Sequence, residues 1–249
     1  MTRCPLYEII ERMNGGDPYY FFLGAVFFYA AAFPITDILC RAFSDKFKRF
    51  DHDRQYYIIS NVLKSVMLSF VALMFTFVVA VGILNPFYIT GFTELRIFMV
   101  NTSTLYSVTD IVSLILNYKA QAWSTRFHHL AVAFACWKIY VADFDGEGIY
   151  KGMMMYGAYS ALAAPVNTYL GMRFLVPEKA TWYLKKMALY SYITSCFINW
   201  TWQGYYLLYL GYLGLTEGDY MLIAKMALLA TMIYVWMSDD YVLIAHLRK

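Results

Sequence analysis

Long apolar stretches alternate with short polar segments along almost the whole chain. A helix needs roughly 20 apolar residues to cross a hydrocarbon core about 30 Å thick. Seven stretches approach or exceed this length: 18–42, 56–85, 97–118, 127–142, 151–175, 187–212 and 219–247. Pro, Gly and charged residues, which end helices, fill the segments between them. The pattern predicts an all-α fold, a polytopic integral membrane helix bundle with about seven transmembrane helices.

The same pattern predicts the domain organisation. The apolar stretches occupy residues 18–249 and leave no room for a separate soluble domain, so we expect a single transmembrane helical domain there. Residues 1–17, MTRCPLYEIIERMNGGD, alternate polar and apolar positions and lack the pattern of a cleavable signal. We expect this segment to be an amphipathic N-terminal lead-in that lies at the membrane interface.

Composition agrees with a membrane protein. Hydrophobic residues make up 61% of the chain and charged residues 15%, whereas soluble domains are nearer half apolar and a quarter charged. The net charge is only +3 and the basic residues lie beside apolar stretches, which favours membrane lipids as partners and argues against nucleic acid. The four cysteines, Cys4, Cys40, Cys136 and Cys196, form no CxxC motif, so we predict neither a disulfide framework nor a zinc site.

Basic residues concentrate on one side of the predicted crossings. The side opposite holds only Arg3, Arg12, Arg96 and Lys151. Loops on the cytosolic or matrix side of a membrane carry an excess of Lys and Arg. We therefore predict the C-terminus on that side and the N-terminus on the other. The basic side holds Arg41, Lys46, Lys48, Arg49, Arg54, Lys119, Arg126, Arg173, Lys179, Lys185, Lys186, Arg248 and Lys249.

A set of polar side chains lies inside the crossings or at their ends. Ionisable groups in a bilayer are costly, and each marks a candidate site. When successive helices alternate in direction and rise about 1.5 Å per residue, these side chains reach a similar depth, in the half of the bundle nearest the basic side. This predicted polar layer consists of Lys64, Asp110, His128, His129, Asn167, Asp239 and Asp240.

Two interpretations of the layer stay open. In the first, it lines a hydrophilic pocket open to the basic side, where Asp110 or Asp239 orients a histidine that moves protons. In the second, Lys64 pairs with an aspartate to make burial tolerable and the histidines lie among headgroups. Adjacent histidines point about 100° apart on a helix, so His128 and His129 cannot share one metal ion; one is expected to face the bundle and the other a neighbour or the interface. We predict no metal and no cofactor.

Three stretches carry a family resemblance. In YSVTDIVSLILNYKAQAWSTRFHHLAV, Asp110 inside one helix is followed by His128 and His129 at the start of the next. YSALAAPVNTYLGMRFL follows, with Pro165 and Asn167, and DRQYYIISNVLKSVMLS precedes them. Together they resemble the TLC domain, a multi-helix membrane fold of ceramide synthases and of smaller lipid-handling proteins, over a core of about residues 50–245. The resemblance is closer to the small members that are not ceramide synthases.

The departures from the family pattern bear on function. Ceramide synthases carry an acidic pair in the helix after their histidines, whereas residues 151–175 here contain no Asp or Glu. An acyl transfer that needs a carboxylate beside a histidine loses that partner, and Asp110 is the remaining candidate.

We therefore predict first a TLC-like membrane protein that binds or organises lipid without catalysis. The first alternative is an accessory or structural subunit of a larger membrane complex, such as a mitochondrial respiratory assembly, with other membrane subunits as partners. The second is a ceramide-synthase-like lipid N- or O-acyltransferase with His128 or His129 as the base and Asp110 orienting it. The resemblance implies the endoplasmic reticulum, and the mitochondrial inner membrane fits the charge bias equally well.

Overall fold

The computed structural model describes residues 18–84, 93–116, 121, 123–140 and 148–249, and the predicted lead-in over residues 1–17 lies outside them. All regular structure in this described part is helical, which confirms the all-α prediction. The helices are α2 (Pro18–Phe43), α3 (Asp45–Lys48), α4 (His52–Leu84), α5 (Thr93–Leu116), α6 (Trp123–Tyr140), α7 (Ile149–Ala161), α8 (Ala164–Met172), α9 (Glu178–Glu217) and α10 (Tyr220–Arg248).

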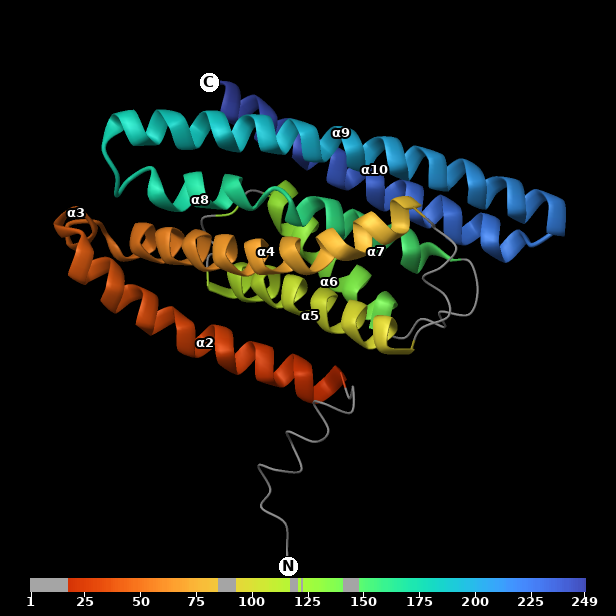
Figure 1. The fold of residues 1–249 in the computed structure, drawn as a ribbon, viewed down its shortest axis with the longest axis horizontal. Coiled ribbons are helices and arrows are strands. Elements are labelled where there is room, and N and C mark those ends of the chain that lie inside the picture. The colour runs from red at the N-terminus through yellow and green to blue at the C-terminus, as the bar shows by residue number, and fades with distance from the viewer. Residues whose placement is uncertain (1–17, 85–92, 117–120, 122, 141–147) are drawn as a thin grey trace, which may run out of the picture.

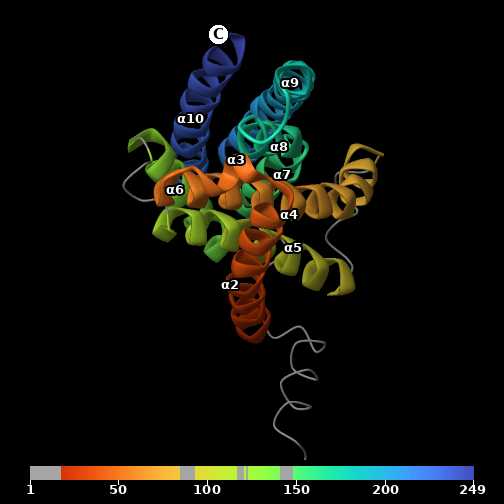
Figure 2. The ribbon, with the colours of Figure 1, turned by 90° about the vertical axis from the view of Figure 1, so that its left-hand side faces the viewer.

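The long helices lie side by side, and neighbours along the chain run in opposite directions (Figure 1). α9 and α10 form a long antiparallel hairpin along one side of the bundle, α7 and α8 pack beneath α9, and α4 and α5 follow. α2 packs against α4 and α5 and diverges from the rest, as the end view also shows (Figure 2). α3, the α8–α9 connection and the C-terminal end of α10 share one end of the bundle. Basic residues that the sequence spreads over several connections therefore gather at this end, called the basic end below.

The predicted single helix over residues 151–175 is wrong, because this stretch is two helices. α7 ends at Ala161 and α8 starts at Ala164, with Pro165 in its first turn. A proline inside a helix has no N–H to donate and its ring clashes with the carbonyl four residues earlier. The backbone instead makes tight turns, in which the Leu162 N–H donates to Tyr159 O at 3.1 Å and the Ala163 N–H to Ser160 O at 3.0 Å.

The α9–α10 hairpin depends on a two-residue turn. Gly218 adopts a left-handed conformation with φ of 68°, and its N–H donates to Gly214 O, an arrangement that glycine accepts without a steric penalty. The next residue, Asp219, caps α10 by accepting a hydrogen bond from the Leu222 N–H at 2.9 Å. The two long helices are thereby reversed within a few residues and pack along their length.

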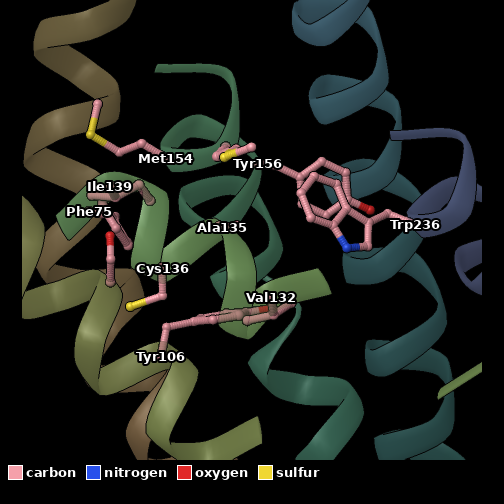
Figure 3. Close-up of a pocket in the computed structure, with 12 residues that line it drawn as sticks. Phe75, Tyr106, Val132, Ala135, Cys136, Ile139, Met154, Tyr156 and Trp236 are labelled. Carbon is pink, nitrogen blue, oxygen red and sulfur yellow. The ribbon is translucent and has the colours of Figure 1, made fainter. Parts of the chain in front are cut away.

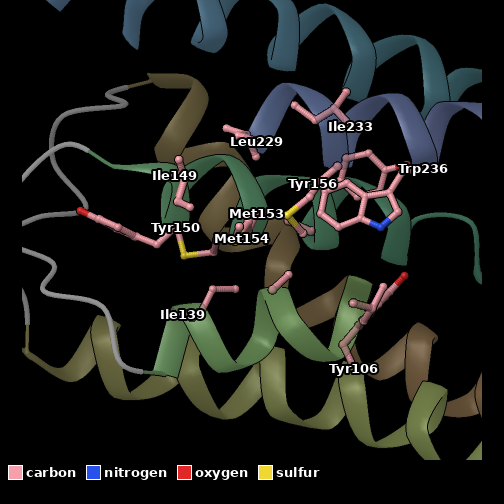
Figure 4. Packing of buried hydrophobic residues seen from close by; sticks show 14 of the residues in the cluster. Tyr106, Ile139, Ile149, Tyr150, Met153, Met154, Tyr156, Leu229, Ile233 and Trp236 are labelled. Atoms are coloured by element: carbon pink, nitrogen blue, oxygen red, sulfur yellow. The ribbon is translucent and has the colours of Figure 1, made fainter. Parts of the chain in front are cut away.

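The main hydrophobic core surrounds α7. Met153, Met154 and Tyr156 of α7 pack against Leu229 and Trp236 of α10 (Figure 4). The rings of Tyr156 and Trp236 lie 4.2 Å apart between centroids, close enough for the offset contacts that aromatic pairs favour. α7 is thus the central helix against which the outer helices pack.

Three helices of the described part are long and apolar enough to cross a membrane: Tyr20–Phe43, His52–Leu73 and Tyr220–Arg248. Their apolar side chains are not all used in packing, since only 11% of the most apolar window of the first is buried. Phe27 and Phe43 of α2 are 72% and 86% exposed. Apolar surface of this extent marks contact with a membrane or another protein.

α4 and α8 approach closely at Gly171, where a Cβ atom would lie 2.9 Å from Val62 Cγ2 and 3.1 Å from the Val62 nitrogen. We expect Gly171→Ala to lower the free energy of unfolding by about 1–3 kcal/mol through overpacking. Gly204→Ala on α9 is the matched control, because an added Cβ there meets nothing within 4 Å. Thermal unfolding in detergent measures both variants, and equal midpoints would contradict the prediction.

Candidate functional site: a polar pocket at the basic end

A pocket of about 390 Å³ lies between α4, α6, α8 and α10, in the half of the bundle nearest the basic end. Its volume falls in the range of about 300–1,000 Å³ that is typical of small-molecule sites. Of the predicted polar layer, the lining includes Lys64, His128, His129, Asn167, Asp239 and Asp240. Asp110 is fully buried and bonded to Lys64. The structure therefore gathers the whole layer in and directly behind one wall of the pocket.

Asp110 of α5 connects three helices. Its Oδ1 atom accepts a hydrogen bond from Lys64 Nζ of α4, so Lys64 pairs with an aspartate as one interpretation of the sequence predicts. His129 of α6 brings Nδ1 to 3.1 Å from the same oxygen, a close contact without a hydrogen bond. The carboxylate has no exposed surface. Its charge is therefore balanced from within the bundle, by Lys64.

His128 has a different carboxylate partner. Its Nδ1 lies 3.6 Å from Asp239 Oδ2 of α10, and both side chains reach the pocket surface, with 14% and 18% exposed. His129 lines the pocket as well. α6 packs between α5 and α10. Because the two histidines point about 100° apart on α6, His129 reaches α5 and His128 reaches α10. The two rings are nearly perpendicular, at 86°.

The neighbouring aspartate, Asp240, is held by three neutral donors. The Tyr192 hydroxyl donates at 2.6 Å, the Tyr156 hydroxyl at 2.9 Å and the Trp200 indole at 3.1 Å. These donors come from α7 and α9 and join both helices to α10. Hydrogen bonds to an ionised acceptor are roughly twice as strong as neutral ones. Asp240 therefore acts mainly in the architecture, whereas Asp239 keeps its carboxylate available to the pocket.

No family model, curated protein or solved structure was found to match the chain. The chemistry of the pocket has to indicate its ligand. Carboxylates, imidazoles and amides line it together with apolar residues such as Leu68, Val166 and Leu243. A lining of this kind suits an amphiphile, whose polar and apolar parts each find matching side chains.

A second, smaller cavity has a mainly apolar lining (Figure 3). Its lining includes Phe75, Cys136, Met154 and Trp236, and Tyr106 borders both cavities. Its volume of about 30 Å³ is room for roughly two water molecules. The cavity is therefore too small for a lipid chain.

Metal chemistry finds no support in the described part of the chain, where no group of three or more His, Cys, Asp or Glu side chains could hold an ion. Cys40, Cys136 and Cys196 are free thiols on three different helices.

Proposed function

We propose that the protein is a TLC-like integral membrane protein that binds lipid in the polar pocket without catalysing a reaction on it. The observation that carries this proposal is the pocket of about 390 Å³, lined by polar and apolar side chains inside a helical bundle. Ionisable groups inside a membrane are costly, and each therefore marks a candidate functional site. Burial alone would explain the Lys64–Asp110 pair, because each charge balances the other. It does not explain why Asp239, His128 and Asn167 face an open volume.

The membrane arrangement belongs to the same proposal. Each of the seven predicted crossings corresponds to a helix or, for the fifth, to the α7–α8 pair, and three of these helices have the length and hydropathy of membrane spans. We infer seven crossings, with the basic end on the cytosolic or matrix side. The pocket then opens toward that side, where headgroups are available. The endoplasmic reticulum and the mitochondrial inner membrane both agree with this orientation.

We infer that the protein does not catalyse acyl transfer because few carboxylates are free to assist a histidine. α7 and α8 carry no acid, and Asp110 is already engaged by Lys64. One observation favours a second candidate function, the acyltransferase: His128 faces the pocket with Asp239 3.6 Å away, an arrangement that suits a general base and its orienting group. Asp239→Asn would then abolish acyl transfer from an acyl donor to an amine or hydroxyl acceptor, measured on the purified protein, and an inactive wild-type protein would exclude this candidate.

We expect Asn167→Phe to reduce retained lipid by roughly tenfold, because a bulky side chain in the pocket costs about 1–3 kcal/mol in overlap with the ligand. Native mass spectrometry of protein purified gently from its own membrane measures the lipid and any partner chains. Thr194→Phe on the exposed face of α9 is the control for side-chain size. Equal retention in both variants contradicts the proposal, and a stoichiometric set of partner chains without bound lipid favours the subunit alternative.

A further inference from the structure

Arg173 follows directly after the last residue of α8 and contacts two residues of the pocket lining, Tyr57 and His246. Its backbone N–H donates to Tyr169 O at 2.9 Å, and its carbonyl accepts a hydrogen bond from Thr181 Oγ1 at 3.3 Å. The start of α9 therefore fixes the Arg173 backbone from one side and α8 fixes it from the other. A side chain on such a backbone is presented in a defined direction.

Aromatic rings hold the guanidinium group. Its central carbon lies 4.6 Å from the ring centroid of Phe174, 5.6 Å from that of Tyr169 and 6.0 Å from that of Tyr57. Its Nη1 atom is 3.3 Å from His246 Nε2 of α10. Tyr57 and His246 both line the polar pocket. The positive charge of Arg173 is therefore directed to the pocket edge, in contact with residues of the lining.

This positive charge has no counter-charge nearby. Among the described residues, no carboxylate lies within 4.0 Å of the side-chain nitrogens of Arg173 or His246. The Arg173 Nε atom is buried and has no hydrogen-bond partner there. Lys185 and Lys249 add positive potential at His246. A buried donor without a partner destabilises the folded protein. An anionic acceptor at this place would satisfy both the charge and the donor.

We propose that Arg173 and His246 bind the phosphate monoester of a lipid headgroup at the mouth of the polar pocket. This proposal rests on the proposed lipid-binding function and names the headgroup chemistry. A phosphate monoester carries a charge of about −1.5 to −2 at pH 7, which matches a site with several cations and, among the described residues, no carboxylate within 4.0 Å of Arg173. The guanidinium fork also fits phosphate oxygens in a bidentate way, as an ammonium group does not.

The acids deeper in the pocket explain why the phosphate stays at the mouth. Asp239 lies seven residues before His246 on α10, which places it about 10 Å deeper on nearly the same helix face. Its carboxylate and that of Asp240 repel an anion and favour hydroxyl donors. The phosphate therefore binds at Arg173, while hydroxyl groups of the lipid backbone face Asp239 and the apolar lining receives the beginning of a chain.

The experiment places the protein in bilayer discs of phosphatidylcholine that contain a small fraction of phosphatidic acid, a lipid with a phosphate monoester. Native mass spectrometry then gives the ratio of the two lipids retained by the protein. We expect phosphatidic acid to be enriched over its bulk fraction by roughly tenfold, the effect of one strong charged contact worth about 1.4 kcal/mol. Arg173→Ala should remove this enrichment and leave the total lipid retained unchanged.

Arg54→Ala is the matched control. Arg54 is at the same end of the bundle and also stacks on Phe174, at 5.2 Å. Its ring contacts are with Phe50 and Phe174, which lie outside the pocket lining, whereas Arg173 contacts the lining residues Tyr57 and His246. Equal losses in both variants would show diffuse surface electrostatics and overturn the proposal. Arg173→Lys serves as a second variant that keeps the charge, and it should retain only part of the enrichment.

The remaining outcomes separate the two proposals. Lipid retained by the wild-type protein without a preference for phosphatidic acid overturns the phosphate site alone, whereas no retained lipid overturns the lipid-binding function as well. A titration with inorganic phosphate in lipid-free detergent tests whether the site binds free phosphate instead of a lipid headgroup. Binding of inorganic phosphate that depends on Arg173, together with no enrichment of phosphatidic acid, would overturn the lipid headgroup as the ligand.

Discussion

Replacement of Asp110 by alanine should lower the free energy of unfolding by about 3–5 kcal/mol, the cost of leaving one member of a buried ion pair alone. The Lys64 side chain is 15% exposed and its partner carboxylate is not exposed at all. Without Asp110, the Lys64 ammonium group would remain in the bundle with little access to water. For a chain of this length the change corresponds to a fall in the thermal midpoint of roughly 6–20 °C.

The double variant Lys64→Met with Asp110→Leu tests whether the loss comes from the uncompensated charge of Lys64. A buried ion pair replaced by apolar side chains of similar volume is often neutral or stabilising. We therefore expect the double variant to recover most of the loss, so that the two single effects are strongly non-additive. Tryptophan fluorescence during heating in detergent provides the midpoints. Single effects that simply add would mean that Lys64 and Asp110 do not compensate each other.

The helices were predictable because the apolar stretches are long and their ends are marked by polar residues. The seven predicted ranges match α2, α4, α5, α6, the α7–α8 pair, α9 and α10 to within several residues, except that α9 extends from Glu178 to Glu217. The break at Leu162–Ala163 was missed although Pro165 signals it. Membrane helices tolerate proline when neighbouring groups satisfy the freed backbone, and the sequence alone does not tell a tolerated proline from one that ends a helix.

The polar layer was predictable for a different reason. Depth along each helix follows from residue number and direction, so residues as far apart as Lys64 and Asp239 could be placed at one level. Which histidine contacts which aspartate was not predictable, because it depends on how α6 is oriented between α5 and α10. His129 contacts Asp110 and His128 contacts Asp239. The sequence left both aspartates open as partners, and the packing uses both.

The three hydrogen-bond donors to Asp240 could not be predicted from the sequence. Tyr156, Tyr192 and Trp200 lie 84, 48 and 40 residues away from it. The chain has 24 tyrosines and 6 tryptophans, so residue type does not select these three among the others. Only the packing of α7 and α9 against α10 brings the donors to one carboxylate. Long-range hydrogen bonds of this kind need the tertiary structure.

The adjacent aspartates 239 and 240 should respond very differently to substitution. Asp240→Ala leaves the hydroxyls of Tyr156 and Tyr192 and the indole N–H of Trp200 without their acceptor. Each unsatisfied buried donor costs about 1–3 kcal/mol, so we expect a loss of at least about 3 kcal/mol in the free energy of unfolding. Asp240→Asn keeps an acceptor oxygen and should lose less.

Asp239→Asn should change the free energy of unfolding by no more than about 0.5 kcal/mol, as is usual for a substitution that breaks no buried network. Its carboxylate is 18% exposed and lies 3.6 Å from His128 Nδ1, its one ion pair among the described residues. Because it faces the pocket, the same substitution should reduce retained lipid by several-fold, the effect of about 1 kcal/mol from one charged hydrogen bond. Unfolding midpoints and lipid retention measured on the same preparations separate the two roles. If Asp239→Asn destabilised the protein as much as Asp240→Ala, the carboxylate would belong to the architecture, and the pocket would lose its one acid that is free to meet a ligand.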